Sequence, residues 1–449
     1  MDLRRPIART RAVSRAARRL PAALAALLAL LLPAGQPLAA RQNGHARTPV
    51  IGQIRVTGNH RFSTKKIIAA SGLRSGAPAR QRDLEQAASR LAQSGAFSDV
   101  SYQYRARGKT WDAILQVVEV QQFAPCIFDN FVWFSDAELT VAIERAFPLF
   151  DGSMAESRGM QEAVTAAANS FLSAHGIRGS TAIRPVFDLS HNLIGFLLHV
   201  DGVPMPLKDV QVEGGPLDAA AIREVAHGIL SYDYSRHTAE YWAQTALTEE
   251  YQDEGYLQPH FSGPVVAFAD PTGKDVSQGV VAKFLATPGL RYHWGGVSWM
   301  GDETLSAEQL TRLMVLSTGD IAGRKETLAG WDAVRQAFGR QGYLTADVAA
   351  TPVFDDHAAT VHYNAQITKG PQFTMGELVV DDPSPEVVKA VNAAWKIRRG
   401  EVYTTDAEKE SRQRILQAQS RMRRADKRLA FHRSLNTAAH TVSVLVKFE

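Results

Sequence analysis

The sequence predicts an α+β fold of five tandem repeats, each a three-stranded mixed sheet covered by two helices. The 449 residues exceed one ordinary core, because domains usually run to roughly 100–200 residues. Helix-like segments end in a glycine at intervals of 79 to 87 residues, at Gly95, Gly176, Gly255 and Gly342. Strand-like endings recur at intervals of 79 to 87 residues too, at Val120, Gly202, Gly289, Gly370 and Glu449.

The N-terminal segment has the three parts of a secretory signal peptide. Seven arginines accompany an Ala/Leu run from Pro21 to Leu32, and small residues follow up to Ala40. We expect cleavage after Ala40, so that residues 1–40 are the signal peptide and residues 41–47 a linker. An uncleaved membrane anchor is the alternative, although the apolar run is shorter than the roughly 20 residues that span a bilayer.

The charge of the chain argues against nucleic-acid binding, and its cysteine content excludes an intramolecular disulfide. Without residues 1–40 the chain has 43 basic and 45 acidic residues, a formal charge of −2, although the whole chain is at +4. A cationic surface for nucleic acid is therefore not expected, and we predict no nucleic-acid partner. Cys126 is the only cysteine, so no intramolecular disulfide can form, and we expect a small buried side chain there.

Each repeat has the same order of elements. A leading strand, such as IGQIRVTG from Ile51, precedes a helix whose N-cap is a serine, as at Ser63, Ser135 and Ser306. The second helix ends at the recurrent glycine, where the left-handed conformation carries no steric cost, and a hairpin completes the unit. The unit is β-α-α-β-β, and the predicted boundaries are 48–121, 122–204, 205–289, 290–370 and 371–449.

This order of elements sets the sheet geometry. Two antiparallel helices return the chain, so the second strand runs against the first and the third runs along it. Three strands cannot close into a barrel, so at least one strand is left as an open edge.

At this point the chain resembles a tandem array of POTRA (polypeptide-transport-associated) domains, as in BamA-type outer-membrane assembly proteins. The unit order, the period and the segments KGPQFTMGELVV, QAFGRQGYLTADV and LTEEYQDEGYLQPHF carry the resemblance, which covers residues 48–449. It implies a periplasmic protein at the outer membrane that handles unfolded outer-membrane polypeptides and performs no chemistry. Such domains are thought to bind by strand addition, in which an extended client pairs its backbone with the exposed edge.

Two departures from that family stand out. BamA-type proteins continue into a barrel, whereas this chain ends at Phe448-Glu449, so we expect no membrane insertion by this chain alone and a separate outer-membrane barrel protein as a possible partner. The fifth unit also lacks the glycine at the helix-to-strand join, where it has SRMRRADKRLAFH from Ser420.

Proline placement selects a candidate binding edge. The second strands of units two to four contain Pro185, Pro259, Pro264 and Pro352, and proline removes a backbone donor. Units one and five keep proline-free segments, so we predict a polypeptide-binding edge in unit one, formed by Val100, Ser101, Tyr102, Gln103 and Tyr104. The alternative is that these prolines only mark strand ends.

A basic run in unit five is the second candidate site. Residues 396–433 hold twelve Lys or Arg against five acids. This run could attract anionic headgroups or an acidic partner, with peripheral membrane association as a possibility, or it could be a solvated helix face. The predicted basic surface is formed by Arg412, Arg414, Arg421, Arg423, Arg424, Lys427 and Arg428.

Motifs for chemistry are missing from the sequence. There is no HExxH or paired CxxC, no G-x-S-x-G elbow, and the cluster Asp355-Asp356-His357 fits a hairpin turn better than a metal site. We predict no catalytic residues, no metal and no cofactor. The leading prediction is a client-binding scaffold. The alternatives are a structural subunit that docks on a separate barrel without touching clients, and an enzyme concealed in one unit.

Overall fold

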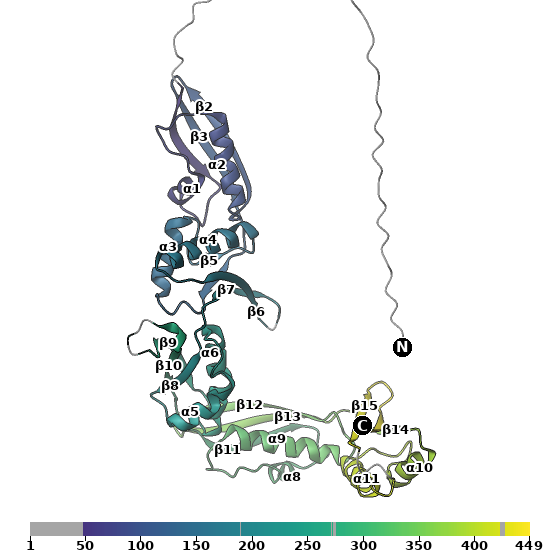
Figure 1. Cartoon of the computed structure of the whole chain (residues 1–449). Helices are drawn as coiled ribbons and strands as arrows, with labels where there is room; N and C mark the ends of the chain where they lie inside the picture. Colours follow the sequence, from purple (N-terminus) through teal and green to yellow (C-terminus); the bar gives the residue numbers. More distant parts are fainter. Residues whose placement is uncertain (1–47, 189, 271, 273–274, 423–426) are drawn as a thin grey trace, which may run out of the picture. The chain divides into compact units, whose positions relative to one another are not determined.

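The computed structural model describes residues 48–449 apart from 189, 271, 273–274 and 423–426. The predicted signal peptide and linker over residues 1–47 lie outside the described residues. Within the described part, strands and helices follow one another in five repeats of the predicted order (Figure 1).

The first two repeats have these elements. Repeat one contains β1 (Val50–Thr57), α1 (Thr64–Ser71), α2 (Gln81–Gln93), β2 (Phe97–Arg107) and β3 (Thr110–Glu119). Repeat two contains β4 (Ala124–Phe128), α3 (Asp136–Ala146), β5 (Ser153–Met154), α4 (Arg158–Ala174), β6 (Ser180–Phe187) and β7 (Leu193–Asp201).

The remaining three repeats follow the same plan with broken or short helices. Repeat three contains β8 (Leu207–Glu213), α5 (Ala219–Val225), the 3-10 turn Ala226–Gly228, α6 (Arg236–Trp242), the π-helical turn Ala243–Leu247, α7 (Thr248–Asp253), β9 (His260–Phe268), the 3-10 turn Val276–Gln278 and β10 (Val280–Thr287). Repeat four contains β11 (His293–Gly301), α8 (Ala307–Thr311), α9 (Arg324–Gly339), β12 (Asp347–Asp355) and β13 (Thr360–Thr368). Repeat five contains β14 (Thr374–Asp381), α10 (Pro385–Ala394), α11 (Thr405–Ala418), β15 (Leu429–Asn436) and β16 (Thr441–Phe448).

The helix ends follow the predicted cap chemistry. The hydroxyls of Ser63, Ser135 and Ser306 each accept a backbone N–H of the helix that follows, and the last two belong to capping boxes. The four recurrent glycines all have positive φ, at 71° for Gly95 and 76 to 88° for the others. Each join is a helix end that a residue with a Cβ would adopt only with strain.

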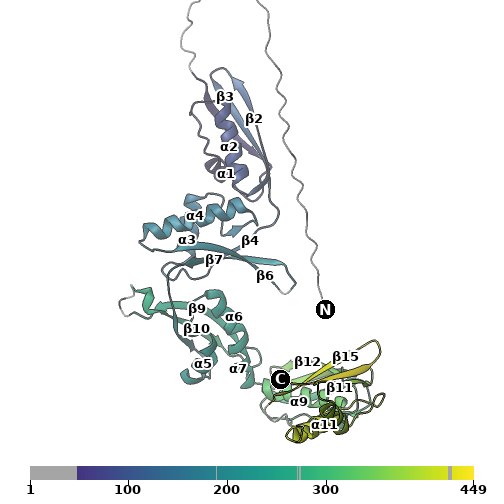
Figure 2. The same ribbon diagram turned by 45° about the vertical axis from the view of Figure 1, so that its right-hand side comes forward.

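The sheets have the predicted mixed topology. The orders are β1-β3-β2, β8-β10-β9, β11-β13-β12 and β14-β16-β15, so the third strand of each repeat lies in the centre. The leading strand pairs with it in parallel and the second strand in antiparallel fashion. A pair of helices lies beside each sheet, as α1 and α2 do in repeat one (Figures 1 and 2).

Repeat two departs from the three-strand prediction. Its sheet has four strands in the order β5-β4-β7-β6, because the segment between its helices pairs with the leading strand through Ala124↔Met154 and Pro125↔Ser153. The other repeats have a single bridge at the equivalent place: Val50↔Pro78, Pro206↔Asp233, His293↔Ile321 and Thr374↔Val402. The inter-helix loop therefore covers the beginning of the leading edge in all five repeats.

Each repeat has its own apolar core between sheet and helices. The described residues form five clusters of buried side chains, one in each repeat. In repeat four, for example, Trp294 of β11 and Trp331 of α9 both lie beside Tyr363 of β13, with ring centroids 5.2 and 5.7 Å from it. These aromatic rings thus form part of the packed core of repeat four.

Candidate functional site

The second strand of each repeat is the edge that stays open. β2 pairs with β3 along its length, from Phe97↔Glu119 to Arg107↔Thr110, and no other strand of the described chain lies beside it. The predicted segment from Val100 to Tyr104 occupies the middle of β2. It therefore lies at an edge that offers unpaired backbone groups.

The side chains of this segment alternate between two faces. Val100 and Tyr102 are half-buried and contact the core of repeat one, whereas Ser101 and Gln103 are exposed. The Tyr102 hydroxyl donates to Oε1 of Glu85 on α2 at 3.3 Å, and burial together with the Glu85 charge raises the pKa of Tyr102. Tyr104 is 42% exposed and stacks on Trp111 at 4.4 Å. The edge thus has an aromatic and an open polar face.

Three of the prolines lie inside edge strands. Pro185, Pro264 and Pro352 are within β6, β9 and β12, so the interpretation that they mark strand ends is wrong for these three, whereas Pro259 precedes β9. Pro185 lies opposite Phe196 and Pro352 opposite Tyr363 in the central strands. Because proline is tolerated in an edge strand where its nitrogen faces away from the ladder, these positions mark outward-facing backbone.

The same register identifies the outward-facing backbone in β2. Pro352 lies opposite Tyr363, the fourth residue of β13. Tyr104 likewise lies opposite Ala113, the fourth residue of β3. Since backbone groups alternate along a strand, Val100, Tyr102 and Tyr104 direct their N–H and C=O groups away from β3.

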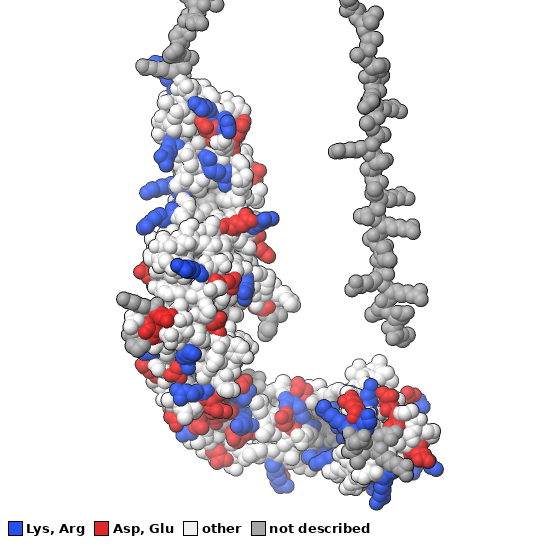
Figure 3. Space-filling model, in the orientation of Figure 1, with Lys and Arg blue, Asp and Glu red and all other residues white. Residues whose placement is uncertain are grey.

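The predicted basic surface of repeat five divides into paired and unpaired cations. Arg412 pairs with Glu408 at 2.5 Å and Arg414 pairs with Glu410 at 3.3 Å. Arg421, Lys427 and Arg428 are exposed and make no ion pair within the described chain, and Arg423 and Arg424 lie outside the described residues. Figure 3 shows acidic and basic side chains interspersed along the chain. Much of the excess charge is therefore offset locally.

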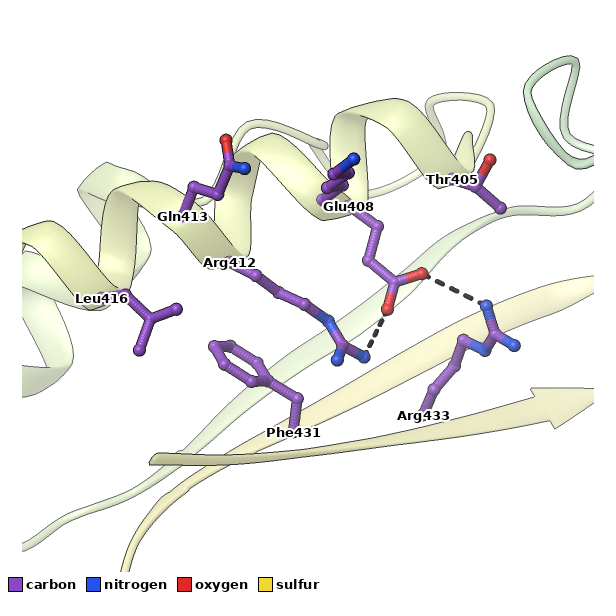
Figure 4. A pocket seen from close by; sticks show the side chains of 8 residues that line it. Thr405, Glu408, Arg412, Gln413, Leu416, Phe431 and Arg433 are labelled. Carbon is purple, nitrogen blue, oxygen red and sulfur yellow. Dashed lines mark hydrogen bonds and ion pairs between the residues drawn. The ribbon is translucent and has the colours of Figure 1, made fainter. Parts of the chain in front are cut away.

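Part of the basic run lines a groove between α11 and β15. The groove has a volume of about 560 Å³ and is bordered by Arg412 and Leu416 of α11 and by Phe431 and Arg433 of β15 (Figure 4). Glu408 is 6% exposed and accepts from Arg412 and, at 3.2 Å, from Arg433. The basic surface predicted from the sequence contains Arg412 and not its neighbour Arg433, because the carboxylate that both share depends on the register of β15.

A second buried carboxylate, not anticipated from the sequence, lies between repeats two and three. Asp129, 1% exposed, accepts from His199 Nδ1 at 2.8 Å, from Ser235 Oγ at 2.8 Å and from the His237 amide at 2.9 Å. Burial opposes its charge, but these hydrogen bonds lower the pKa of Asp129. Ser235 is the N-cap of α6, so the anion lies at a helix N-terminus.

This cluster contains Ser, His and Asp without the geometry of a catalytic triad. Both the Ser235 hydroxyl and the His199 imidazole donate to the Asp129 carboxylate, whereas a nucleophile must donate to the imidazole. The arrangement serves to join α6 to the turn after β4. Asn130 adds to that turn, since its amide donates to the Val200 carbonyl at 3.0 Å.

Other candidate chemistry is structural where the chain is described. No group of three or more His, Cys, Asp or Glu side chains is placed to hold a metal ion within the described residues. Asp355 caps the turn between β12 and β13 by accepting the amides of His357 and Ala358 at 3.0 Å each. Of the helices in the described region, none is both long and apolar enough to span a membrane.

These features define a class of protein: a tandem array of small α+β repeats with one open sheet edge in each. Residues 49–120 match the POTRA family model, described as a surface antigen variable number repeat, so repeat one is a POTRA domain. The other repeats share the element order of repeat one, and three of them also share its three-stranded sheet topology, so the chain resembles a tandem array of POTRA-type domains.

Three solved structures show similarity to this chain. BamA POTRA3–5 of Haemophilus influenzae shares 16% identity over 55% of this chain and 96% of its own, with a TM-score of 0.42. The N-terminal domain of Omp85 from Thermosynechococcus elongatus shares 12% identity over 71% and 97%, with a TM-score of 0.19. POTRA1–3 of the periplasmic domain of Omp85 from Anabaena shares 11% identity over 71% and 95%, with a TM-score of 0.19. A search of curated protein sequences finds no match.

Proposed function

We propose that this chain is a periplasmic POTRA-repeat protein of outer-membrane protein assembly or transport. It binds unfolded polypeptides or assembly partners by strand addition to the second strand of a repeat, with β2 as the principal edge. Support for the compartment comes from the signal-like N-terminal segment and the family of repeat one. The module is a binding module, with no chemical step in its task.

The observation that carries the proposal is the difference between the two borders of each sheet. The leading border is covered at its beginning by the inter-helix loop, as in Val50↔Pro78. The other border has no neighbouring strand within the described chain. Backbone hydrogen bonds to such an edge supply affinity with little demand on client sequence, which suits a protein that receives many different unfolded chains.

The presence or absence of proline divides the edge strands of the repeats into two groups, blocked and open. β2 and β15 contain no proline, whereas β6, β9 and β12 each contain one, which in β9 lies at a register irregularity. A visiting strand loses at least one ladder hydrogen bond on the blocked edges, and each such bond contributes about 1 kcal/mol. Repeats one and five are therefore the expected binding repeats.

Photocrosslinking in intact cells tests this proposal. A photoreactive residue replaces Gln103, whose side chain is exposed beside the edge, and Val353 in the proline-blocked β12 serves as the matched site. We expect crosslinks to unfolded outer-membrane polypeptides from position 103 and few from position 353.

The variant Tyr102→Pro separates backbone pairing from side-chain contact. It removes an outward-facing N–H and should abolish the crosslinks from position 103, whereas Tyr102→Ala should retain most of them. Unchanged crosslinking in Tyr102→Pro would refute strand addition at β2. Crosslinks to one stable membrane barrel, with no unfolded client, would instead favour a structural subunit.

A further inference from the structure

The groove of repeat five has a helix wall and a strand wall that face one another. On α11, Glu408, Arg412 and Leu416 follow at intervals of four residues, so they lie on one helix face, with Lys409 beside them. On β15, Phe431 and Arg433 are two residues apart and share one face of the strand. Figure 4 shows the side chains of Glu408, Arg412, Phe431 and Arg433 directed into the space between the two elements.

The charges in the groove do not balance. Arg412 and Arg433 share the single Glu408 carboxylate, at 2.5 and 3.2 Å. Lys409 is exposed at the rim and has no ion pair within the described chain. Among the described residues, the groove therefore has three cations against one acid, and an incoming anion would meet a net positive charge.

Arg412 also holds an unsatisfied donor. Its guanidinium stacks on the Phe431 ring at 4.7 Å, and its buried Nε has no hydrogen-bond partner among the described residues. A buried donor without an acceptor costs about 1–3 kcal/mol. An acidic side chain entering the groove would bring acceptor oxygens to this region.

The strand register places an added strand directly over the groove. Phe431 lies opposite Val446 and Arg433 opposite Val444, and both valines are buried, so this face of β15 is the helix-side face. Arg433 lies opposite Val444, the fourth residue of β16, just as Pro352 lies opposite Tyr363, the fourth residue of β13. The backbone of Phe431 and Arg433 therefore faces away from β16.

We propose that repeat five selects extended polypeptide segments with an acidic side chain opposite Arg433 and an apolar one two residues away, opposite Phe431. This inference rests on the proposed strand addition and adds a rule for the segment. Charge-assisted hydrogen bonds to arginine are roughly twice as strong as neutral ones, and Phe431 and Leu416 provide the apolar contact. The cations lie beside an open backbone ladder, which a polypeptide can use and a lipid headgroup cannot.

Fluorescence anisotropy with the purified protein tests the rule. The probes are two labelled nine-residue peptides of alternating apolar and polar residues, identical except for Glu or Gln at one position of the apolar face. We expect the Glu peptide to bind about tenfold more tightly, with the preference decreasing as salt is added. Lys409→Gln should weaken the preference, and Glu408→Gln should increase it, because the groove then keeps its cations without their anion.

Two control variants locate the effect. Arg414→Gln removes a cation of the same helix that pairs with Glu410 outside the groove, and it should leave the preference unchanged. Leu435→Pro removes an outward-facing donor of β15 beyond the groove and should weaken the binding of both peptides to a similar extent, by about fivefold for a lost hydrogen bond of about 1 kcal/mol. Circular dichroism checks that each variant is folded.

The outcomes distinguish the rule from the proposed function. Equal binding of the Glu and Gln peptides, with weaker binding of both in Leu435→Pro, overturns the acidic rule and leaves strand addition intact. Failure of both peptides to bind, or binding that Leu435→Pro leaves unchanged, overturns both. Binding to phosphatidylglycerol vesicles that falls in Lys409→Gln, without any peptide preference, assigns the groove to the membrane surface and also overturns the rule.

Discussion

Replacing Asp129 by Asn removes the charge that joins α6 to the turn after β4. The carboxylate is 1% exposed and accepts three hydrogen bonds of 2.8 to 2.9 Å, from His199, Ser235 and the His237 amide. Hydrogen bonds to a charged group contribute about 1.5–3 kcal/mol each, but such contributions do not add fully. We expect a local cost of about 3 kcal/mol, because Asn keeps the shape and loses the charge.

Hydrogen exchange measures this local cost where a global unfolding curve would average over five repeats. A loss of about 3 kcal/mol corresponds to roughly a 100-fold faster exchange of amides in the first turn of α6, the His237 amide included. Asp136→Asn is the matched control, because this half-exposed carboxylate pairs with Arg236 at 2.6 Å on the surface. Its effect should stay below about tenfold. Equal exchange rates in the two variants would refute the reasoning. So would an exchange rate in Asp129→Asn that is no faster than in the wild-type protein.

The same carboxylate predicts a dependence on pH. Its hydrogen bonds lower the pKa of Asp129 in the folded protein, below the value of about 4 for an unfolded chain. The stabilisation is therefore complete above that unfolded value and is lost as the pH falls through the lower folded pKa. Protection of the first turn of α6 should be constant from about pH 7 to 5 and should fall below about pH 4, with no such acid step in Asp129→Asn.

Three further substitutions or reagents test other parts of the fold. Glu119→Gln should destabilise repeat one by about 2 kcal/mol, seen as faster exchange at residues 60–62, because this carboxylate accepts three consecutive amides at 2.8 to 3.1 Å. Gly95→Ala should lower the urea midpoint more than Gly176→Ala: both have positive φ, but a Cβ on Gly95 would lie 2.1 Å from Ser157 Oγ and one on Gly176 meets nothing within 4 Å. Equal midpoints would contradict this. Cys126 is half-buried and not fully buried as the sequence predicts; burial, with a smaller effect of Asp136, still raises the pKa of its thiol to about 12, so a disulfide reagent at pH 8 should react much more slowly with the native protein than with the unfolded one, and equal rates would contradict this.

The repeat plan could be predicted from the sequence because its signals are local. A glycine such as Gly342, four residues after the apolar Phe338, marks a helix end without reference to the rest of the chain. Once the order β-α-α-β-β is known, the parallel and antiparallel pairings follow from chain direction, and the structure has both. The strand order does not follow from chain direction: the sequence predicts only that at least one strand is an open edge, and the structure has β3 in the centre and β2 at the edge.

Long-range polar contacts could not be predicted, since they depend on register. The i,i+4 spacing of Glu408 and Arg412 is visible in the sequence, but Arg433 is 25 residues beyond Glu408 and reaches it only through the pairing of β15 with β16. Ser235 is 106 residues beyond Asp129. The two-residue strand Ser153–Met154 is too short for an alternating pattern.

The loop that covers the beginning of every leading strand has a consequence for self-association. If both borders of a sheet were accessible, the second strand of one copy could pair with the leading strand of the next, and copies could add without limit, as in fibrils. Because Val50↔Pro78 and its equivalents cover the beginning of the leading border, pairing between two copies of one repeat is favoured at their second strands, as an isologous pair related by a two-fold axis. In such a pair both second strands are covered, so those two repeats have no further open second strand for another copy.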